Sequence, residues 1–351
     1  MSKIPTVIVG MSGGVDSSVV ALLLKQQGYR VIGLFMKNWD EKNERGVCPA
    51  ALEYEDVARV CDKLDIPYYS INFVKEYWEN VFAVSLKEFQ AGYTPNPDIL
   101  CNREIKFKVF FDKAMELGGD FLATGHYCQT QNNQLLKGLD PEKDQSYFLY
   151  TIKENILKKV LFPIGHLQKK EVREIARKYD LPTSDKKDST GICFIGERNF
   201  KEFLKQFLKP NPGHFEDLKG KILGSHEGIA YYTIGQRKGL GIGGAGEAWF
   251  VVNKDYKRNV VILAQGNDHP SLYQQSLIAT DLTWVSDKIL QLPLNCKAKV
   301  RYRQEDQACT IHKTEEGKLF VSFALPQRAI TPRQSIVFYD NEVCLGGGMI
   351  Q

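Results

Sequence analysis

The sequence has no apolar run long enough to cross a membrane, no closely spaced cysteine pair and no Walker A loop. Its longest aliphatic run, Val19–Leu24, has six residues, whereas a transmembrane helix needs ~20. The eight cysteines are at least 13 residues apart, so the CxxC pairs of zinc and dithiol sites are absent. The N-terminus also lacks the basic region and cleavage site of a secretory signal. These absences predict no membrane span and a cytoplasmic location, where most cysteines are small buried side chains.

Charge and length give broader indications. The chain has 351 residues and a net charge of +4, which is too small to indicate a nucleic-acid partner by itself. Residues 153–187 hold ten basic and five acidic residues, and a solvated helix face explains this excess as well as a phosphate-binding surface does. The composition, 43% apolar and 25% charged, is that of a globular protein. At ~150 residues per domain, the length predicts two to three domains.

The first part of the chain alternates strands with helices. Apolar and β-branched runs predict strands at 5–10, 30–36, 67–73 and 121–126. Amphipathic stretches predict helices at 17–27, 53–65, 75–90 and 102–117. This alternation is typical of an α/β fold with a doubly wound, Rossmann-like parallel sheet. Ligands of such sheets bind at the carboxyl ends of the strands.

The pattern changes near residue 200. A predicted helix at 199–208 is followed by the breaker Pro210–Gly213, and short glycine-rich strands come next. From about residue 272, short β runs recur at roughly ten-residue spacing, which is typical of a small barrel. We therefore expect three domains, at 1–200, 201–270 and 271–351, of which the last is a β-barrel.

The clearest motif is Ser12–Ser18 (SGGVDSS), which lies between a buried strand and a predicted helix. Glycines let backbone N–H groups approach an anion, and a helix start adds unpaired N–H groups and a favourable dipole. A capped helix after a tight turn is the alternative, because Ser and Asp are good N-caps. Position and composition together favour phosphate binding, and the missing Lys-Ser/Thr pair excludes an ordinary Walker A loop.

A second glycine-rich stretch is a weaker signal. Gly239–Gly246 contains G-x-G-x-x-G twice. A dinucleotide-binding loop needs a strand before it and a helix after it, and neither is predicted here. We therefore expect a flexible loop rather than a nicotinamide or flavin site.

Two segments place cysteines among polar residues. In Thr94–Asn102 (TPNPDILCN), two prolines predict a stiff loop that carries Asp98 and Cys101 ahead of the next helix. If Asn102 caps that helix, its positive end would lower the pKa of the Cys101 thiol; a cysteine in a surface turn explains the segment equally well. Polar residues around Cys193 indicate an exposed loop. A cytoplasmic location argues against a permanent Cys101–Cys193 disulfide but permits a transient one.

These motifs resemble those of a known family. Ser12–Ser18, with its strand–loop–helix context, resembles the PP-loop of ATP pyrophosphatases. Further blocks are similar, in the same order, to the signatures of bacterial tRNA-specific 2-thiouridylases: NPDILCN at 96–102, TGHY at 124–127, KDQSYFL at 143–149, STGICFIG at 189–196 and YTIGQRKGL at 232–240. The barrel segments around Arg301 and Gln334 also look like that family, so the resemblance covers essentially the whole chain.

The resemblance implies ATP-dependent 2-thiolation of the wobble uridine, position 34, of tRNA. ATP would adenylate the C2 oxygen, and a cysteine persulfide would then supply the sulfur, giving 2-thiouridine, AMP and pyrophosphate. Mg²⁺ would neutralise the phosphates, with Asp16 as its candidate ligand. The ATP-binding residues implied are Gly10, Met11, Ser12, Gly13, Gly14, Val15, Asp16, Ser17, Met36 and Gly125.

The resemblance also implies the sulfur chemistry and the partners. Cys193 would carry the persulfide, Cys101 would be the nucleophile that forms a transient disulfide with it, and Asp98 would be an acid/base near the target base. The partners implied are tRNA and a sulfur-relay protein or cysteine desulfurase, with the enzyme as a monomer. Contacts with the tRNA or its target base are implied for Asn96, Pro97, Asp98, His126, Lys143, Asp144, Gln145, Arg301, Tyr302 and Gln334.

Two other functions stay open on the residues alone. A synthetase that adenylates a small molecule would share the phosphate loop but would need no paired cysteines. A non-catalytic RNA-binding or redox-sensing protein would release neither AMP nor pyrophosphate in the presence of tRNA.

Overall fold

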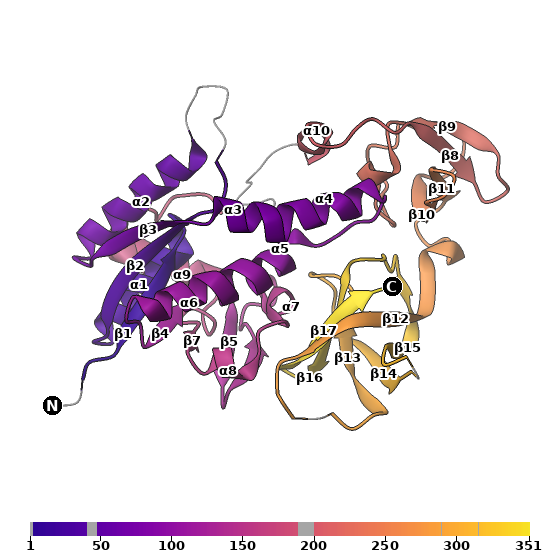
Figure 1. Ribbon diagram of the computed structural model, residues 1–351. Helices are drawn as coiled ribbons and strands as arrows, with labels where there is room; N and C mark the ends of the chain where they lie inside the picture. The colour runs from indigo at the N-terminus through magenta and orange to yellow at the C-terminus, as the bar shows by residue number, and fades with distance from the viewer. Residues whose placement is uncertain (1–2, 41–47, 189–199, 289, 315) are drawn as a thin grey trace.

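The computed structural model describes residues 3–40, 48–188, 200–288, 290–314 and 316–351. An α/β region, a small central sheet and a C-terminal barrel follow one another along the chain (Figure 1). In the described ranges, no helix combines the length and the hydropathy that a membrane crossing requires.

The α/β region is built on a five-stranded sheet with the order β3-β2-β1-β4-β7, in which every pairing is parallel. The central strand β1 is β-branched and buried on both faces, as expected for a parallel sheet covered by helices. The expectation of a doubly wound parallel sheet is therefore confirmed. The strands are β1 (Thr6–Met11), β2 (Arg30–Lys37), β3 (Tyr68–Asn72), β4 (Phe121–Ala123) and β7 (Val160–Leu161).

Helices pack on both faces of this sheet, and two hydrophobic clusters form the core between them. One face is covered by α1 (Val15–Gln26), α2 (Pro49–Lys63) and α9 (Lys169–Lys178). The other is covered by α3 (Val74–Tyr77), the π-helical segment η1 (Trp78–Phe82), α4 (Ala83–Gln90), α5 (Pro97–Leu100), the π-helical segment η2 (Cys101–Val109) and α6 (Phe110–Glu116). Two short helices, α7 (Ser146–Leu149) and α8 (Glu154–Leu157), precede β7 in the chain.

The helix expected at 102–117 begins earlier, at Pro97, and runs through α5, η2 and α6; we call it the Pro97 helix. Asn96 is its N-cap and accepts a hydrogen bond from the Ile99 N–H at 3.4 Å. Proline suits the first helical position because its missing N–H would have no partner there. The prediction that Asp98 and Cys101 lie in a loop ahead of the helix, with Asn102 as the cap, is therefore wrong.

The central region contains a four-stranded sheet with the order β10-β11-β8-β9. The stretch Gly239–Gly246 between β9 and β10 is irregular and largely exposed, so the prediction of a loop without a dinucleotide-binding fold is confirmed. The elements are α10 (Phe200–Lys205), β8 (Gly213–Asp217), β9 (Ile222–His226), the 3-10 turn η3 (Ile229–Tyr231), β10 (Trp249–Asp255), β11 (Val260–Gln265) and the 3-10 turn η4 (Pro270–Leu272).

The C-terminal region is the expected barrel. Six antiparallel strands follow the order β12-β15-β14-β13-β16-β17, and the pairing of β12 with β17 closes them. The strands are β12 (Tyr273–Trp284), β13 (Leu294–Lys299), β14 (Gln307–Lys313), β15 (Leu319–Arg328), β16 (Ser335–Asp340) and β17 (Val343–Ile350).

A hairpin of the α/β region extends this barrel sheet. It consists of β5 (Cys128–Gln131) and β6 (Gln134–Lys137), and β6 pairs with β17. Lys137 also forms an ion pair with Asp306 of the barrel at 2.6 Å. The sequence analysis did not predict this hairpin, which joins the first and last regions of the chain through backbone hydrogen bonds.

Candidate functional site

The loop Ser12–Ser18 joins the carboxyl end of β1 to the start of α1. Gly14 is the N-cap of α1, and no side chain caps it, so the alternative of a side-chain-capped helix is wrong. The Ser17 hydroxyl instead accepts from the Ser12 N–H at 3.2 Å and donates to the Gly14 carbonyl. The N–H groups of the first turn of α1 can therefore bind an anion.

Two glycines allow other elements to approach this loop closely. Gly13 has φ +71°, and a Cβ there would lie 2.6 Å from the Glu53 carbonyl oxygen. Gly125, just after β4, would place a Cβ 3.1 Å from the Cβ of Asp16. With Met36 at the end of β2, the ends of three neighbouring strands meet at the loop, which fits a bound nucleotide.

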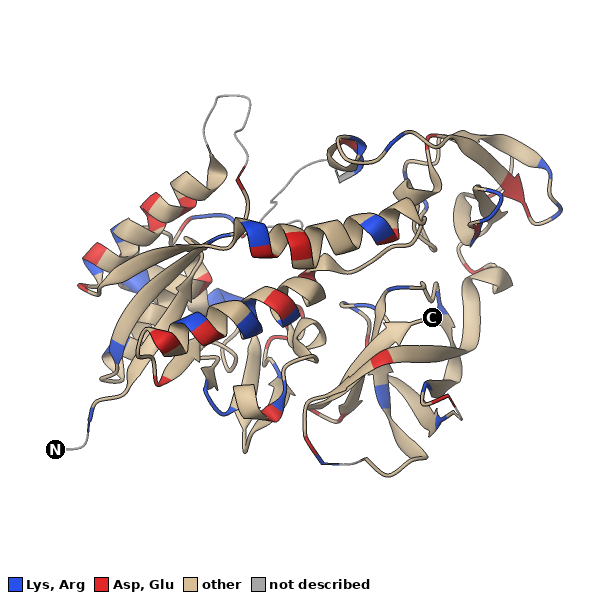
Figure 2. Cartoon of the chain, viewed as in Figure 1, with Lys and Arg blue, Asp and Glu red and all other residues tan. Residues whose placement is uncertain are grey.

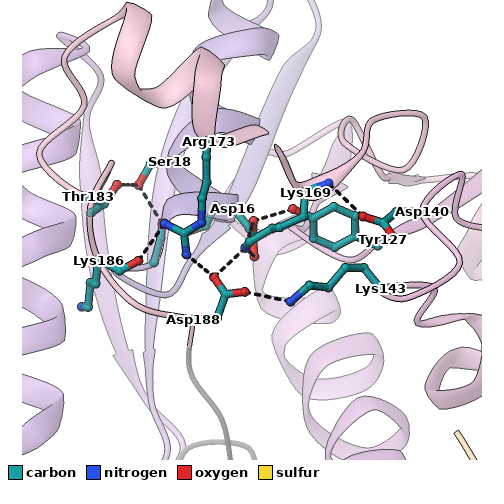
Figure 3. Close-up of polar contacts among 12 residues, drawn as sticks. Asp16, Ser18, Tyr127, Asp140, Lys143, Lys169, Arg173, Thr183, Lys186 and Asp188 are labelled. Carbon is teal, nitrogen blue, oxygen red and sulfur yellow. Dashed lines mark hydrogen bonds and ion pairs between the residues drawn. The ribbon is translucent and has the colours of Figure 1, made fainter. Parts of the chain in front are cut away.

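Lys169 on α9 lies directly against the loop (Figure 3). Its ammonium group contacts both Asp16 carboxylate oxygens, at 2.7 and 2.9 Å, and an Asp188 oxygen at 2.8 Å. Tyr127 donates its hydroxyl to Asp16 at 2.7 Å. Burial and the Asp16 charge raise the pKa of Tyr127, so the phenol stays protonated and acts as a donor.

Asp188 forms ion pairs with three cationic side chains. Lys143, Lys169 and Arg173 approach its carboxylate at 2.8, 2.8 and 2.6 Å. Burial alone would raise the pKa of Asp188, but the hydrogen bonds from the two lysines lower it to about 2. Lys186 adds a fourth cation and donates to the Gly13 carbonyl at 3.0 Å. Asp16, Asp56 and Asp188 pair with these cations, which lie beside a helix start where a polyphosphate could bind.

The basic stretch 153–187 therefore divides between its two interpretations. Lys169 and Lys186 contact the phosphate loop and Arg173 contacts Asp188 beside it, whereas Lys170 and Lys178 are exposed. Figure 2 shows Lys and Arg interspersed with Asp and Glu over all three regions. Lys169 and Arg173 share a face of α9, and their i,i+4 spacing is the signal that could have identified the inward pair.

The described residues contain no group of three or more His, Cys, Asp or Glu that could hold a metal ion. Asp16 is the carboxylate at the phosphate loop itself, and Mg²⁺ commonly binds one or two carboxylates together with substrate phosphates and water. Asp16 could join a magnesium ion carried mainly by ATP only by exchanging its contacts with Lys169 and Tyr127, so its role as a magnesium ligand stays a prediction.

Cys101 is completely buried in the Pro97 helix, one position after α5. Cys193 lies outside the described residues, and the described chain before it ends at Asp188, at the phosphate loop. The pairing of the two cysteines therefore stays a prediction.

Two buried asparagines near these elements have amide atoms without a hydrogen-bond partner in the described part of the chain. They are Asn38, directly after β2, and Asn102, next to Cys101. An unpaired buried polar group costs ~1–3 kcal/mol unless a ligand satisfies it. The sequence pattern pointed to Asn102 only as a possible helix cap, and nothing in the spacing around Asn38 marks it.

Some residues implied to contact tRNA are engaged within the α/β region. His126 is buried, and its ring nitrogens lie 2.8 Å from the Thr124 hydroxyl and 3.4 Å from the Lys106 ammonium. Burial and the Lys106 charge lower the pKa of His126, which favours the neutral ring. Asp144 is also buried and accepts hydrogen bonds from the N–H and the hydroxyl of Ser146.

Other residues in that set lie where the three regions meet. Arg301 of the barrel donates to the Ile234 carbonyl of the central region at 2.7 Å. The Tyr302 hydroxyl lies 3.4 Å from the Lys143 carbonyl, and Gln334 donates to the Thr94 carbonyl at 2.6 Å. The structure thus brings residues of this set from the α/β region close to those from the barrel, while their contacts with tRNA stay predictions.

The whole chain is similar to known proteins. Three family profiles match: the tRNA methyl transferase HUP domain at 5–197, the tRNA methyl transferase PRC-barrel domain at 201–265 and the aminomethyltransferase beta-barrel domain at 274–350. The tRNA-specific 2-thiouridylase MnmA of Protochlamydia amoebophila is 63% identical over 100% of this chain and 94% of its own length. This chain belongs to the tRNA-specific 2-thiouridylase family.

Further 2-thiouridylases are similar over nearly their full length. Those of Shouchella clausii and Alkaliphilus oremlandii are 58% and 57% identical over 98% and 100% of this chain, and over 96% and 99% of their own lengths. The family resemblance inferred from the motifs is therefore confirmed.

Proposed function

We propose that the chain catalyses ATP-dependent 2-thiolation of the wobble uridine of tRNA. The observation that carries the proposal is the uncapped α1 start at Ser12–Ser18, flanked by Lys169 and Lys186, in a member of the 2-thiouridylase family. A helix start with adjacent cations binds the phosphates of ATP and stabilises the leaving pyrophosphate.

Adenylation solves the main chemical difficulty of the reaction. The C2 carbonyl of uridine is a poor electrophile, and its oxygen is a poor leaving group. Attack of that oxygen on the α-phosphate of ATP releases pyrophosphate and makes AMP the leaving group. We assign phosphate binding to residues 10–17 with Met36 and Gly125 around the nucleoside, and Asp98 to proton transfer at the base. Bound Mg²⁺ would neutralise phosphate charge during this step.

Sulfur transfer then uses two cysteines. A persulfide on Cys193 either attacks C2 directly or releases sulfide that attacks C2, and AMP departs. In both routes the Cys101 thiol attacks the Cys193 sulfur, so the two thiols form a disulfide and supply the two electrons that reduce the sulfane sulfur. A thiol reductant of the cytoplasm would restore the pair. A sulfur-relay protein or a cysteine desulfurase would reload Cys193.

The remaining assignments follow from the same proposal. Flipping a base out of a single-stranded anticodon loop costs only a few kcal/mol, and the target base would meet Asn96, Pro97 and Asp98. Lys143–Gln145, His126, Arg301, Tyr302 and Gln334 would contact the tRNA. We propose domain boundaries near residues 200 and 270 and a monomeric enzyme.

The decisive experiment measures AMP and 2-thiouridine in one reaction. Unmodified tRNA, labelled ATP, Mg²⁺, cysteine and a cysteine desulfurase are incubated with the protein, and tRNA nucleosides are analysed by mass spectrometry. Cys193→Ser should still form AMP but no 2-thiouridine, because the phosphate loop is intact. Cys48→Ser, which changes a half-buried cysteine in another part of the chain, is the matched control.

The outcomes separate the three functions. Sustained thiolation by Cys193→Ser would remove the role assigned to that cysteine. AMP release that depends on a small molecule but not on tRNA would indicate a synthetase. Tight tRNA binding without AMP or pyrophosphate release would indicate a non-catalytic protein.

A further inference from the structure

The segment 92–96 leads from α4 into the Pro97 helix, and the two other regions of the chain hold its backbone. Lys254 on β10 of the central region donates its ammonium group to the Gly92 carbonyl at 2.7 Å. Gln334 of the barrel donates its amide to the carbonyls of Thr94 and Pro95 at 2.6 and 3.3 Å. Three carbonyls of one short segment are thus fixed by side chains 162 to 240 residues away in sequence.

Side chains of the same segment are held as well. The Tyr93 ring packs against Tyr256 of the central region, with centroids 4.6 Å apart. The Arg333 guanidinium of the barrel lies over the Tyr93 ring, 5.1 Å from the ring centroid. The hydroxyls of Thr94 and Thr233 are 3.4 Å apart. The segment therefore has little freedom to move while the central region is docked.

Among the side chains that hold this segment, Lys254 is the one whose burial is energetically unfavourable. It is 5% exposed, and burial, without a neighbouring carboxylate to offset it, lowers its pKa to about 7. A buried ammonium group without a counter-ion is unfavourable, so packing alone would favour an apolar side chain of similar length. The hydrogen bond to Gly92 is what a lysine adds at this position.

We propose that Lys254 is a positioning residue for thiolation: by holding the Gly92 carbonyl it sets the place of the Pro97 helix, and with it Asp98 and Cys101, relative to the phosphate loop. The inference rests on the proposed function for the identity of the reaction. A displacement of ~1 Å at reacting groups can cost ~100-fold in rate. The central region thereby contributes to turnover without contacting the reacting atoms.

The test compares Lys254→Met, which keeps the length but loses the donor, with Lys254→Arg, which keeps a donor. At saturating tRNA and ATP, Lys254→Met should lower kcat for 2-thiouridine formation about tenfold. KM for ATP should stay the same, because the phosphate loop is unchanged, and Kd for tRNA should change far less than kcat, because only the contacts with the target base at Asn96–Asp98 would move. Lys254→Arg should recover part of kcat. Lys257→Met, an exposed lysine three residues on, is the control and should behave as wild type.

Hydrogen exchange of the protein alone provides a readout that does not depend on activity. The peptide 92–101 should exchange faster in Lys254→Met than in wild type and Lys257→Met. Wild-type kcat in Lys254→Met, or a loss confined to melting temperature or tRNA affinity, would overturn the proposal. If wild-type protein makes no 2-thiouridine, the proposed function has failed. Separately, unchanged hydrogen exchange at 92–101 in Lys254→Met would show that Lys254 does not hold this segment in place. If Lys254→Met does not fold, Thr233→Val, which removes the hydroxyl facing Thr94, takes its place in both measurements.

Discussion

Lys169 connects two carboxylates that are far apart in sequence, Asp16 at the start of α1 and Asp188 at the end of the described chain before Cys193. Its side chain is 13% exposed, so its charge acts in a partly desolvated site where electrostatic interactions are stronger than in water. This ammonium group, together with the hydrogen bonds of Lys186 to Gly13 and of Thr183 to Ser18, holds the segment that ends at Asp188 against the phosphate loop. Under the proposed function, Lys169 therefore lies between the nucleotide site and the segment that precedes Cys193 in the sequence.

Replacing Lys169 by Met should strongly slow AMP formation. The substitution removes the cation beside Asp16 and leaves that carboxylate repelling the ATP phosphates. We expect a loss of roughly 100-fold in the rate of tRNA-dependent AMP release, similar to the loss of one preorganised charge-stabilising donor. Lys170→Met is the control, because Lys170 is 83% exposed and pairs with Glu174 on the outer side of α9. Equal AMP release from the two variants would remove Lys169 from the site.

At the scale of elements, the sequence predicted whether a segment is a helix or a strand better than it predicted where that element begins and ends. The β-branched run at β1 and the SGGVDSS loop were recognisable because local composition alone determines them. The Pro97 helix was misplaced because prolines were read as loop formers, whereas Asn96 as cap and Pro97 at the first position start a helix. The hairpin β5–β6 was missed because its short strands gain stability from pairing with β17, a long-range contact.

The corrected helix start predicts that Cys101 is protected from reagents. A side chain that is completely buried inside a helix reacts only when the helix opens locally. In the folded protein, iodoacetamide should modify the half-buried Cys48 and Cys296 at least about tenfold faster than Cys101. In denaturant the three rates should converge. Peptide mass spectrometry follows each site, and rapid modification of Cys101 in the folded protein would show that this helix assignment is wrong.

At the scale of the whole molecule, the three regions act as one body around two junctions. The segment 92–96 joins the α/β region to the central region and the barrel. The hairpin β5–β6 joins the α/β region to the barrel, and the ion pairs Lys137–Asp306 and Lys299–Asp144 cross that junction. Residues implied to contact tRNA lie beside both junctions, so docking of the regions would shape the RNA surface.

The second junction predicts cooperative unfolding. Lys137 and Asp306 pair at 2.6 Å with side chains 12% and 16% exposed. Breaking a buried pair by removing one partner costs ~3–5 kcal/mol, because the other charge is left poorly compensated. Lys137→Met should therefore destabilise the protein by about 3 kcal/mol, allowing for the second, longer contact of Asp306 with Lys299 at 3.8 Å.

The double variant Lys137→Met, Asp306→Asn should recover part of that loss, since neither charge is then left alone. Because β6 and β17 belong to one sheet, both single variants should lower one common transition, seen alike by near-ultraviolet circular dichroism and by calorimetry. If Lys137→Met shifted only a separate barrel transition and left the α/β region at its original melting temperature, the two regions would unfold independently. The hairpin would then be a contact between two domains that fold independently, rather than part of one cooperative unit.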